Sequence, residues 1–211
     1  MRLEQEIVES ILRTLAASRA LDVGTGSGRY LSVLARTGAA RVVGVDFSMA
    51  MLRKADMAQP FGAAEGAGPE PCATPLVCAD AGHLPFARGA FDVINASLTI
   101  GDTADLSAWT REMARVLARG GHLVYSDFHP SWAQHGWKRT FRGPDGEPQE
   151  LEFVPHAIDD HLSAIDGAGL RTVAIREPRF TNDHDPGVKE FRRRWKNPPV
   201  VVVFHAVNSP W

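Results

Sequence analysis

The sequence has few cysteines and no excess of charge of one sign. Cys72 and Cys78 are its only cysteines among 211 residues. Two are too few for a disulfide framework, and they predict reduced thiols in a cytosolic protein. Lysine and arginine number 23 and aspartate and glutamate 25, which gives a net charge of −2. Such a balance creates no overall field that attracts nucleic acid or anionic lipid, so large polyanionic partners are disfavoured.

Long hydrophobic runs are also missing. The longest mostly apolar run, residues 200–207, is less than half of the roughly 20 residues that a membrane-spanning helix needs. Near the N-terminus stand Glu4, Glu6 and Glu9, where a signal peptide carries a basic start and an apolar stretch. We therefore expect a cytoplasmic protein without membrane insertion.

What the sequence does have is enough hydrophobic residues, 44%, to fill the core of one domain. A chain of this length is expected to fold as a single domain that spans residues 1–211 and buries roughly 70% of the surface of the unfolded chain. Residues 59–75 are rich in proline, glycine and alanine, and this composition predicts a surface loop.

Apolar runs and amphipathic stretches alternate along the chain. The patterns predict strands at 20–23, 41–46, 76–80, 91–95, 122–127, 171–176 and 200–207, and helices at 3–17, 30–35, 48–58, 105–118 and 159–168. Ser48 is expected to cap one helix, and Gly120 with Gly121 to end another. Strands that alternate with helices predict a doubly wound α/β fold with a mostly parallel sheet. Between the last two strands no crossover helix is evident, so periodicity leaves their mutual direction open.

Residues 128–155 break this rhythm and are rich in aromatic side chains. We interpret them as an inserted lid that covers a substrate. Small-ligand pockets are mostly apolar with a few polar groups, and Trp132, His135, Trp137 and Phe141 suit such a lining. The same rings could equally pack on the edge of the sheet.

A glycine-rich loop follows the first predicted strand. It reads Gly24-Thr-Gly-Ser-Gly28 and precedes a helix, an arrangement that lets a ligand approach the backbone and the helix N-terminus closely. Asp46 ends the second strand, 18 positions after Gly28, where a carboxylate binds ribose hydroxyls in doubly wound folds. The third glycine or alanine of a dinucleotide fingerprint is replaced by Arg29. A nucleotide-like cofactor is therefore expected, and a pyrophosphate fits poorly.

Four segments within residues 20–127 resemble class I S-adenosylmethionine-dependent methyltransferases, in particular the small-molecule branch with the ubiquinone and menaquinone methyltransferases. They are Leu21-Asp-Val-Gly-Thr-Gly-Ser-Gly28, Val43-Gly-Val-Asp46-Phe-Ser, Cys78-Ala-Asp80-Ala-Gly-His-Leu-Pro85-Phe86 with Phe91-Asp-Val, and Leu117-Ala-Arg-Gly-Gly-His-Leu-Val124. The resemblance implies a Rossmann-like seven-stranded sheet whose last strand is antiparallel. It also implies S-adenosylmethionine as cofactor and S-adenosylhomocysteine as product.

The resemblance assigns roles in cofactor binding to particular positions. Asp22 would orient the loop, the loop residues would border the methionine part, Asp46 would bind ribose, and the remaining residues would contact the adenine or lie beneath the sulfonium. The full set is Asp22, Gly24, Thr25, Gly26, Gly28, Asp46, Phe47, Met51, Asp80, Ala81, Asn95, Ala96 and Ser97. For Phe47 and Met51, core packing is the alternative.

Methyl transfer from a sulfonium needs alignment above all, and a base only if the acceptor loses a proton. Histidine suits that task at neutral pH. Of the lid histidines we expect His156 first, because it stands where a helix-capping serine or threonine would precede Asp159, and His129 second. Each could instead be structural. The spacing of His129, His135 and His156 matches no helical metal-binding pair, so no metal is expected.

Other functions remain open at this point. A nicotinamide-dependent reductase is disfavoured by Arg29 and by the lack of a Tyr-x-x-x-Lys pair. A non-catalytic S-adenosylmethionine-binding protein would keep the same cofactor motifs. The run Phe191-Arg-Arg-Arg-Trp195-Lys could touch phosphate or RNA but more often forms a solvated face. Asn95-Ala-Ser-Leu differs from the sequence typical of base-amino methyltransferases, so we expect a small-molecule acceptor. The oligomeric state is not predicted.

Overall fold

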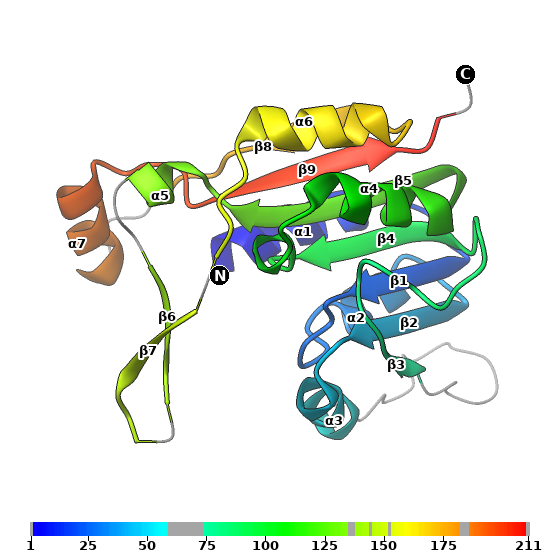
Figure 1. Cartoon of the computed structure of the whole chain (residues 1–211), viewed down its shortest axis with the longest axis horizontal. Coiled ribbons are helices and arrows are strands. Elements are labelled where there is room, and N and C mark those ends of the chain that lie inside the picture. Colours follow the sequence, from blue (N-terminus) through cyan, green and yellow to red (C-terminus); the bar gives the residue numbers. More distant parts are fainter. Residues whose placement is uncertain are drawn as a thin grey trace.

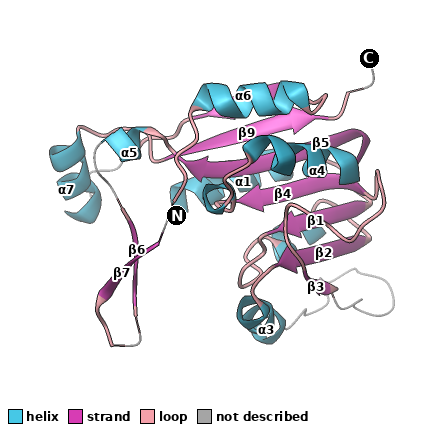
Figure 2. Ribbon diagram, viewed as in Figure 1, coloured by secondary structure: helices cyan, strands magenta, loops and turns pink. Residues whose placement is uncertain are grey.

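Runs of β-branched and apolar residues form one mixed sheet of seven strands, in the order β3-β2-β1-β4-β5-β9-β8 (Figures 1 and 2). The computed structural model describes residues 2–58, 74–134, 138–143, 145–151, 153–181 and 186–209. The strands are β1 (Arg19–Val23), β2 (Arg41–Asp46), β3 (Leu76–Cys78), β4 (Phe91–Ser97), β5 (Leu117–Phe128), β8 (Arg171–Arg176) and β9 (Val201–Val207). The predicted doubly wound α/β class is confirmed.

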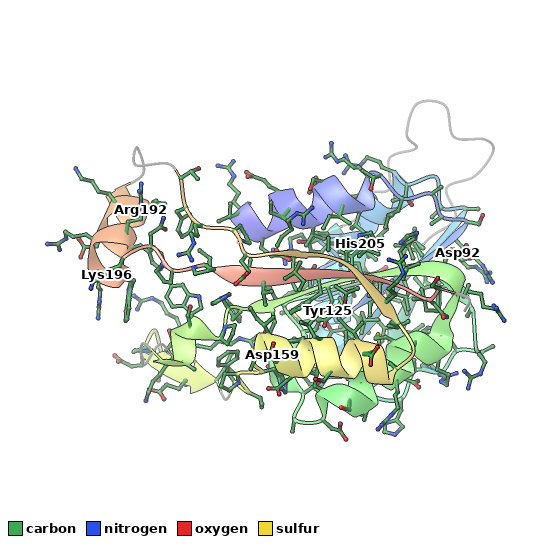
Figure 3. The ribbon with its side chains drawn as sticks, turned by 90° about the horizontal axis from the view of Figure 1, so that it is seen from above. Asp92, Tyr125, Asp159, Arg192, Lys196 and His205 are labelled. Carbon is green, nitrogen blue, oxygen red and sulfur yellow. The ribbon has the colours of Figure 1, made fainter. Side chains whose placement is uncertain are left out.

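Helices cover both faces of this sheet. They are α1 (Arg2–Leu12), α2 (Leu31–Ala35), α3 (Met49–Ala58), α4 (Leu106–Val116) and α6 (Ile158–Gly167). The short α5 (Ser131–Gln134) and α7 (Pro186–Trp195) lie beyond the ends of the strands (Figure 1), and a 3₁₀ turn, η1 (Ile100–Asp102), follows β4. Successive side chains of β4 point to opposite faces. Val93 joins the core under α1 and α2, and Ile94 joins the core under α4 and α6. Figure 3 shows the sheet between α1 and α6.

The direction of the last strand follows the expectation from the resemblance. β9 pairs antiparallel with β5 on one side and with β8 on the other. The pairs β1–β2, β1–β4, β2–β3 and β4–β5 are all parallel. The final strand therefore lies between two strands that run the other way, which settles the direction that periodicity left open.

Two helix ends differ from the prediction by more than one residue. α1 ends at Leu12 rather than at residue 17, because Thr14 and Leu15 turn with i to i−3 hydrogen bonds. α4 begins as expected, with the Asp105 carboxylate accepting from Ala108 N, but it ends at Val116. Leu117 is already extended and starts β5, so the two glycines 120 and 121 lie within that strand instead of ending the helix.

The chain between β8 and β9 also differs from the prediction, because it contains the helix α7. Phe191 and Trp195 of this helix pack against Trp132 of α5, with ring centroids 5.1 and 6.1 Å apart. The aromatic residues of the basic run thus pack inward. Lys196, labelled with Arg192 in Figure 3, follows α7 at the end of the molecule opposite Asp92.

The order of the strands reverses direction between β1 and β4. From β1 the chain proceeds outward to β2 and β3 on one side, whereas β4 and β5 lie on the other. Ligands of open α/β sheets bind at such a reversal, outside the carboxyl ends of the strands. Residues 128–155 include a separate hairpin, β6 (Arg139–Arg142) and β7 (Pro148–Leu151), which projects beyond this same edge (Figure 1). None of the helices described has the length and hydropathy to cross a bilayer.

Candidate active site

The glycine loop connects β1 to α2 at this carboxyl edge. Its three glycines, Gly24, Gly26 and Gly28, have φ values of +65°, +56° and +84°. Residues with a Cβ atom rarely adopt this left-handed region. A Cβ on Gly24 would stand 1.7 Å from Thr99 Cγ2, so the loop packs directly on the segment that follows β4. Within the described part of the chain, a Cβ on Gly26 would meet nothing closer than a carbonyl oxygen at 4.0 Å, so no described residue covers that side of the loop.

Asp46 at the end of β2 faces this loop. Its Oδ2 accepts from Gly26 N at 2.8 Å, and its Oδ1 accepts from Ser48 N at 2.8 Å. Ser48 Oγ in turn accepts from Met51 N at 3.4 Å, which confirms Ser48 as the cap of α3. The carboxylate is 8% exposed. Asp46 therefore holds the tip of the glycine loop and keeps a small accessible surface.

A second carboxylate, that of Asp22 in β1, is also hydrogen-bonded to the loop. Asp22 Oδ2 accepts from Thr25 Oγ1 at 2.6 Å, and its Oδ1 accepts from Asn95 Nδ2 at 2.7 Å. Asp22 and Asn95 are register partners in β1 and β4, so the sheet itself brings them together. Burial raises the pKa of Asp22 to about 6, against the two hydrogen bonds, which lower it. The arrangement suits a group that orients the loop without touching a ligand.

The remaining residues at the end of β4 differ in accessibility. Asn95 and Ala96 have no exposed surface, and Ser97 is 9% exposed. Ser97 Oγ donates to Asn95 Oδ1 at 3.1 Å. Of these three predicted cofactor residues, Ser97 alone thus has accessible surface.

The adenine side of the expected site is open and apolar. Phe47 is 77% exposed and Met51 40% exposed, although both are large hydrophobic side chains that packing would normally bury. Asp80 is also exposed, and the backbone N–H of Gly82, which donates to it at 2.8 Å, lowers the pKa of its carboxyl group. Ala81 is partly buried against the core. Exposed apolar surface beside Asp46 and Asp80 fits an adenine ring and its amino group.

His129 uses both ring nitrogens within the protein. Ser131 N donates to its Nδ1 at 3.2 Å, which makes Nδ1 an acceptor and leaves the proton on Nε2. Nε2 donates to Glu177 Oε1 at 2.8 Å. These contacts join the start of α5 to the segment after β8. His129 is therefore placed as a structural connection, and it would have to break a hydrogen bond to accept a proton.

His156 is placed differently. Its Nε2 lies 2.8 Å from the carbonyl oxygen of Thr103. A carbonyl can only accept, so Nε2 carries the proton and Nδ1 is the nitrogen that can take one up. The side chain is 8% exposed and its ring lies 5.7 Å from that of His161. The tautomer that a general base needs is fixed by the backbone of the segment after η1.

The expected acceptor lining is described only in part. Trp132 is 6% exposed and donates from Nε1 to Val200 O at 2.8 Å, so it packs within the protein rather than lining an open wall. Phe141 lies in β6, at the carboxyl edge of the main sheet, but its side chain is outside the described part. His135 and Trp137 lie outside the described residues altogether.

Sequence reasoning missed three buried polar residues near this edge: Glu4, Asp127 and His161. All three are at most 1% exposed. Asp127 Oδ2 and His161 Nε2 lie 3.6 Å apart, and neither atom has a hydrogen-bond partner among the residues that the structure describes. For Glu4 a signal existed, because it occupies the same helical stripe as the buried Val8 and Leu12. A charged residue within an apolar stripe indicates a buried partner.

The comparisons with known proteins agree with this geometry. Residues 21–125 match the family model of a methyltransferase domain. A biotin biosynthesis bifunctional protein of Cellvibrio japonicus is 30% identical over 172 residues, which are 82% of this chain and 31% of that protein. A demethylmenaquinone methyltransferase of Corynebacterium urealyticum is 34% identical over 110 residues, 52% of this chain and 41% of that protein. The chain thus spans less than half the length of these two relatives.

Among solved structures, an S-adenosylmethionine-dependent methyltransferase from Mesorhizobium loti has a TM-score of 0.73 at 20% sequence identity over 97% of both chains. At that identity the likeness concerns the fold. Fold, glycine loop and the acid that ends β2 together define a class I S-adenosylmethionine-dependent methyltransferase. The chain belongs to this family, whose cofactor is S-adenosylmethionine, and the open loop face at Gly26 and the exposed Phe47 and Met51 fit that cofactor.

Proposed function

We propose that the protein transfers a methyl group from S-adenosylmethionine to a small, partly apolar metabolite. The observation that carries the proposal is the position of Asp46, whose carboxylate is hydrogen-bonded to the tip of the glycine loop. A ribose held by this carboxylate would place the methionine part over the loop and the adenine toward Phe47 and Met51. Neither a nicotinamide reductase nor a dinucleotide site is favoured, because Arg29 follows Gly28 where a small residue would be needed.

We assign to the cofactor-site residues the roles that the family resemblance implies. S-adenosylmethionine supplies an electrophilic methyl group on a sulfonium. Asp46 binds the ribose hydroxyls, and Phe47 and Met51 cover the two faces of the adenine. The Asp80 carboxylate accepts a hydrogen bond from the adenine edge, and the backbone N–H of Ala81 donates one to it. Gly24 to Gly28 and the end of β4 border the methionine part, and rigid placement of these groups supplies the alignment that the displacement requires.

We infer that His156 acts as the base when the acceptor carries a proton. Its Nε2–H is held by Thr103 O, so Nδ1 presents a lone pair. An acceptor hydroxyl or activated carbon would transfer its proton to this nitrogen. His129 is the weaker candidate, because its ring nitrogens bind Ser131 and Glu177.

The acceptor is proposed to bind beneath residues 128–155. Leu151 and Val154 expose apolar surface in this segment, 41% and 36% respectively. The name of one relative, demethylmenaquinone methyltransferase, supports an acceptor with a hydrophobic ring. Demethylated naphthoquinones with short side chains are therefore the first compounds to test, together with other small hydroxylated or activated-carbon metabolites.

Calorimetric titration of S-adenosylhomocysteine into the purified protein tests the cofactor. We expect saturable binding that is lost in Asp46→Ala and retained in Asp56→Ala, which removes an exposed carboxylate from α3. NADH should neither bind nor compete. Binding of NADH, or no binding of S-adenosylhomocysteine by the wild type, would contradict the assignment of the glycine loop.

Release of S-adenosylhomocysteine over a metabolite panel tests catalysis. Turnover with an apolar acceptor is the expected outcome. Tight cofactor binding without turnover on any acceptor would favour a non-catalytic S-adenosylmethionine-binding protein, the main alternative.

A further inference from the structure

Glu4 in the first turn of α1 is a buried carboxylate with three partners from two other parts of the chain. It is 1% exposed. Its Oε1 accepts from Ser126 Oγ at 2.8 Å, and its Oε2 accepts from Tyr30 OH at 2.9 Å. Arg29 Nη1 lies 3.6 Å from the same Oε2. A buried carboxylate is costly unless it is paired and hydrogen-bonded, and these contacts meet that requirement.

The Tyr30 contact leads to the last glycine of the loop. Tyr30 follows Arg29 and Gly28 directly and stands at the start of α2. Leu31 N donates to Gly28 O at 3.2 Å, so the loop passes into the helix at this point. Because Tyr30 is 3% exposed and its hydroxyl is bound to Glu4, the exit of the glycine loop is tied to α1.

The Ser126 contact leads to the first glycine. Ser126 Oγ donates to Glu4 and accepts from Leu98 N at 3.1 Å. Leu98 has a φ of +57°, which is unfavourable for a residue with a Cβ and persists only where surrounding contacts enforce it. The bend places the next residue, Thr99, in van der Waals contact with the backbone of Gly24. The entry of the loop therefore depends on the same carboxylate.

We propose that Glu4 is a positioning residue for cofactor binding, through which α1 sets both ends of the glycine loop. The inference rests on the proposed function. Glycine-rich segments lose much conformational freedom when they become ordered, so a loop braced at both ends binds its ligand at a lower entropic cost. Glu4 needs no contact with the cofactor for this role. Figure 1 shows the start of α1 beside the carboxyl ends of the parallel strands.

Three variants of α1 test the role of the carboxylate. Glu4→Ala should weaken S-adenosylhomocysteine binding by about tenfold or more, the effect of removing a buried charged hydrogen-bond acceptor. Glu4→Gln should stay within about threefold of the wild type, because its amide oxygen accepts from Ser126 and its NH₂ donates to the Tyr30 oxygen. Glu6→Ala, exposed on the same helix, should bind as the wild type does. Dissociation constants come from calorimetry and melting temperatures from thermal unfolding.

Tyr30→Phe and Ser126→Ala each remove one of the two hydrogen bonds of Glu4. They test the proposal even if Glu4→Ala does not fold. Each should weaken S-adenosylhomocysteine binding in the wild-type background. Each should weaken it less in the Glu4→Ala background, because the hydrogen bond to Glu4 is already missing there. A Glu4→Ala protein that melts earlier but binds S-adenosylhomocysteine like the wild type would overturn the proposal, as would full additivity of the double variants. Failure of the wild type itself to bind would instead overturn the proposed function.

Discussion

His129 and His156 are both 8% exposed, and the direction of their hydrogen bonds distinguishes them. In His129 a backbone N–H donates to Nδ1, and a carboxylate accepts a hydrogen bond from Nε2–H. In His156 a carbonyl oxygen accepts a hydrogen bond from Nε2–H. Residue type and spacing cannot reveal this difference, because the acceptors of the two Nε2 hydrogen bonds lie 48 and 53 positions away.

His156→Gln should lower kcat by roughly 10²- to 10⁴-fold with a hydroxyl or activated-carbon acceptor, the range that a general base contributes. Its affinity for S-adenosylhomocysteine should not change. His129→Gln should keep its turnover and melt at a lower temperature, because the link between α5 and the segment after β8 weakens. Steady-state kinetics with calorimetry and thermal unfolding measure both variants. Full turnover by His156→Gln would remove it as the base.

Gly24→Ala should abolish cofactor binding for two separate reasons. The left-handed φ costs about 1–2 kcal/mol for any residue with a Cβ, and the added methyl group would overlap Thr99 Cγ2. Gly38→Ala is the matched control, since Gly38 has a φ of +87° and open space around it, so it should lose stability and keep binding. Adding Thr99→Ser, which removes that Cγ2 atom, should restore part of the affinity lost in Gly24→Ala. No recovery in calorimetry would contradict the contact.

At the scale of secondary structure, agreement with the sequence is best where burial is complete. β2 was predicted at 41–46 and occupies those residues, because an unbroken apolar run bounded by polar residues has one interpretation. α7 was missed. Its apolar side chains are few among many cations, so its pattern lacks a clear period, and its stability comes from packing on Trp132. For Glu4 the helical stripe indicated burial, but its partner Ser126 could not be predicted because it lies 122 positions away.

The hairpin of β6 and β7 should be separable from cofactor binding. It forms its own two-stranded sheet, and Arg139 contacts Asp102 of η1 through an ion pair of 2.6 Å. Replacing residues 139–151 by a short glycine-serine linker should leave S-adenosylhomocysteine affinity unchanged and raise the KM of the acceptor. The matched control is Lys138→Ala, which removes a surface ion pair with Glu150 and should have little effect. Loss of cofactor affinity in the replacement would show that the hairpin belongs to the cofactor site.

At the scale of the whole molecule, a histidine pair joins the parallel and antiparallel parts of the sheet. His122 Nδ1 lies 2.9 Å from His205 Nε2, across β5 and β9. Burial, then the charges of His122 and Arg176, lower the pKa of His205 to about 4. The unfolded chain therefore binds a proton at this residue more readily than the folded chain does.

Stability should consequently fall on acidification between about pH 6.5 and pH 4. Above this window His205 is neutral in both states, so its titration does not change the free energy of unfolding. Within the window the loss of stability grows toward an upper limit of about 3 kcal/mol. In His205→Phe, urea unfolding at a series of pH values should show a weaker dependence, whereas His83→Gln, at an exposed histidine, should follow the wild type. Equal pH dependence of all three proteins would contradict the assignment.

The position of β9 has a consequence for biosynthesis. β5 and β8 are synthesised before β9, the strand that lies between them in the sheet. Until β9 has been synthesised, the edge of each strand that will pair with it is unpaired. If the two paired with each other first, they would run parallel, and β9 would have to displace one from the other. Nascent chains stalled upstream of Val201 should therefore expose β-rich edges and recruit chaperones, and release of the complete strand should end that interaction.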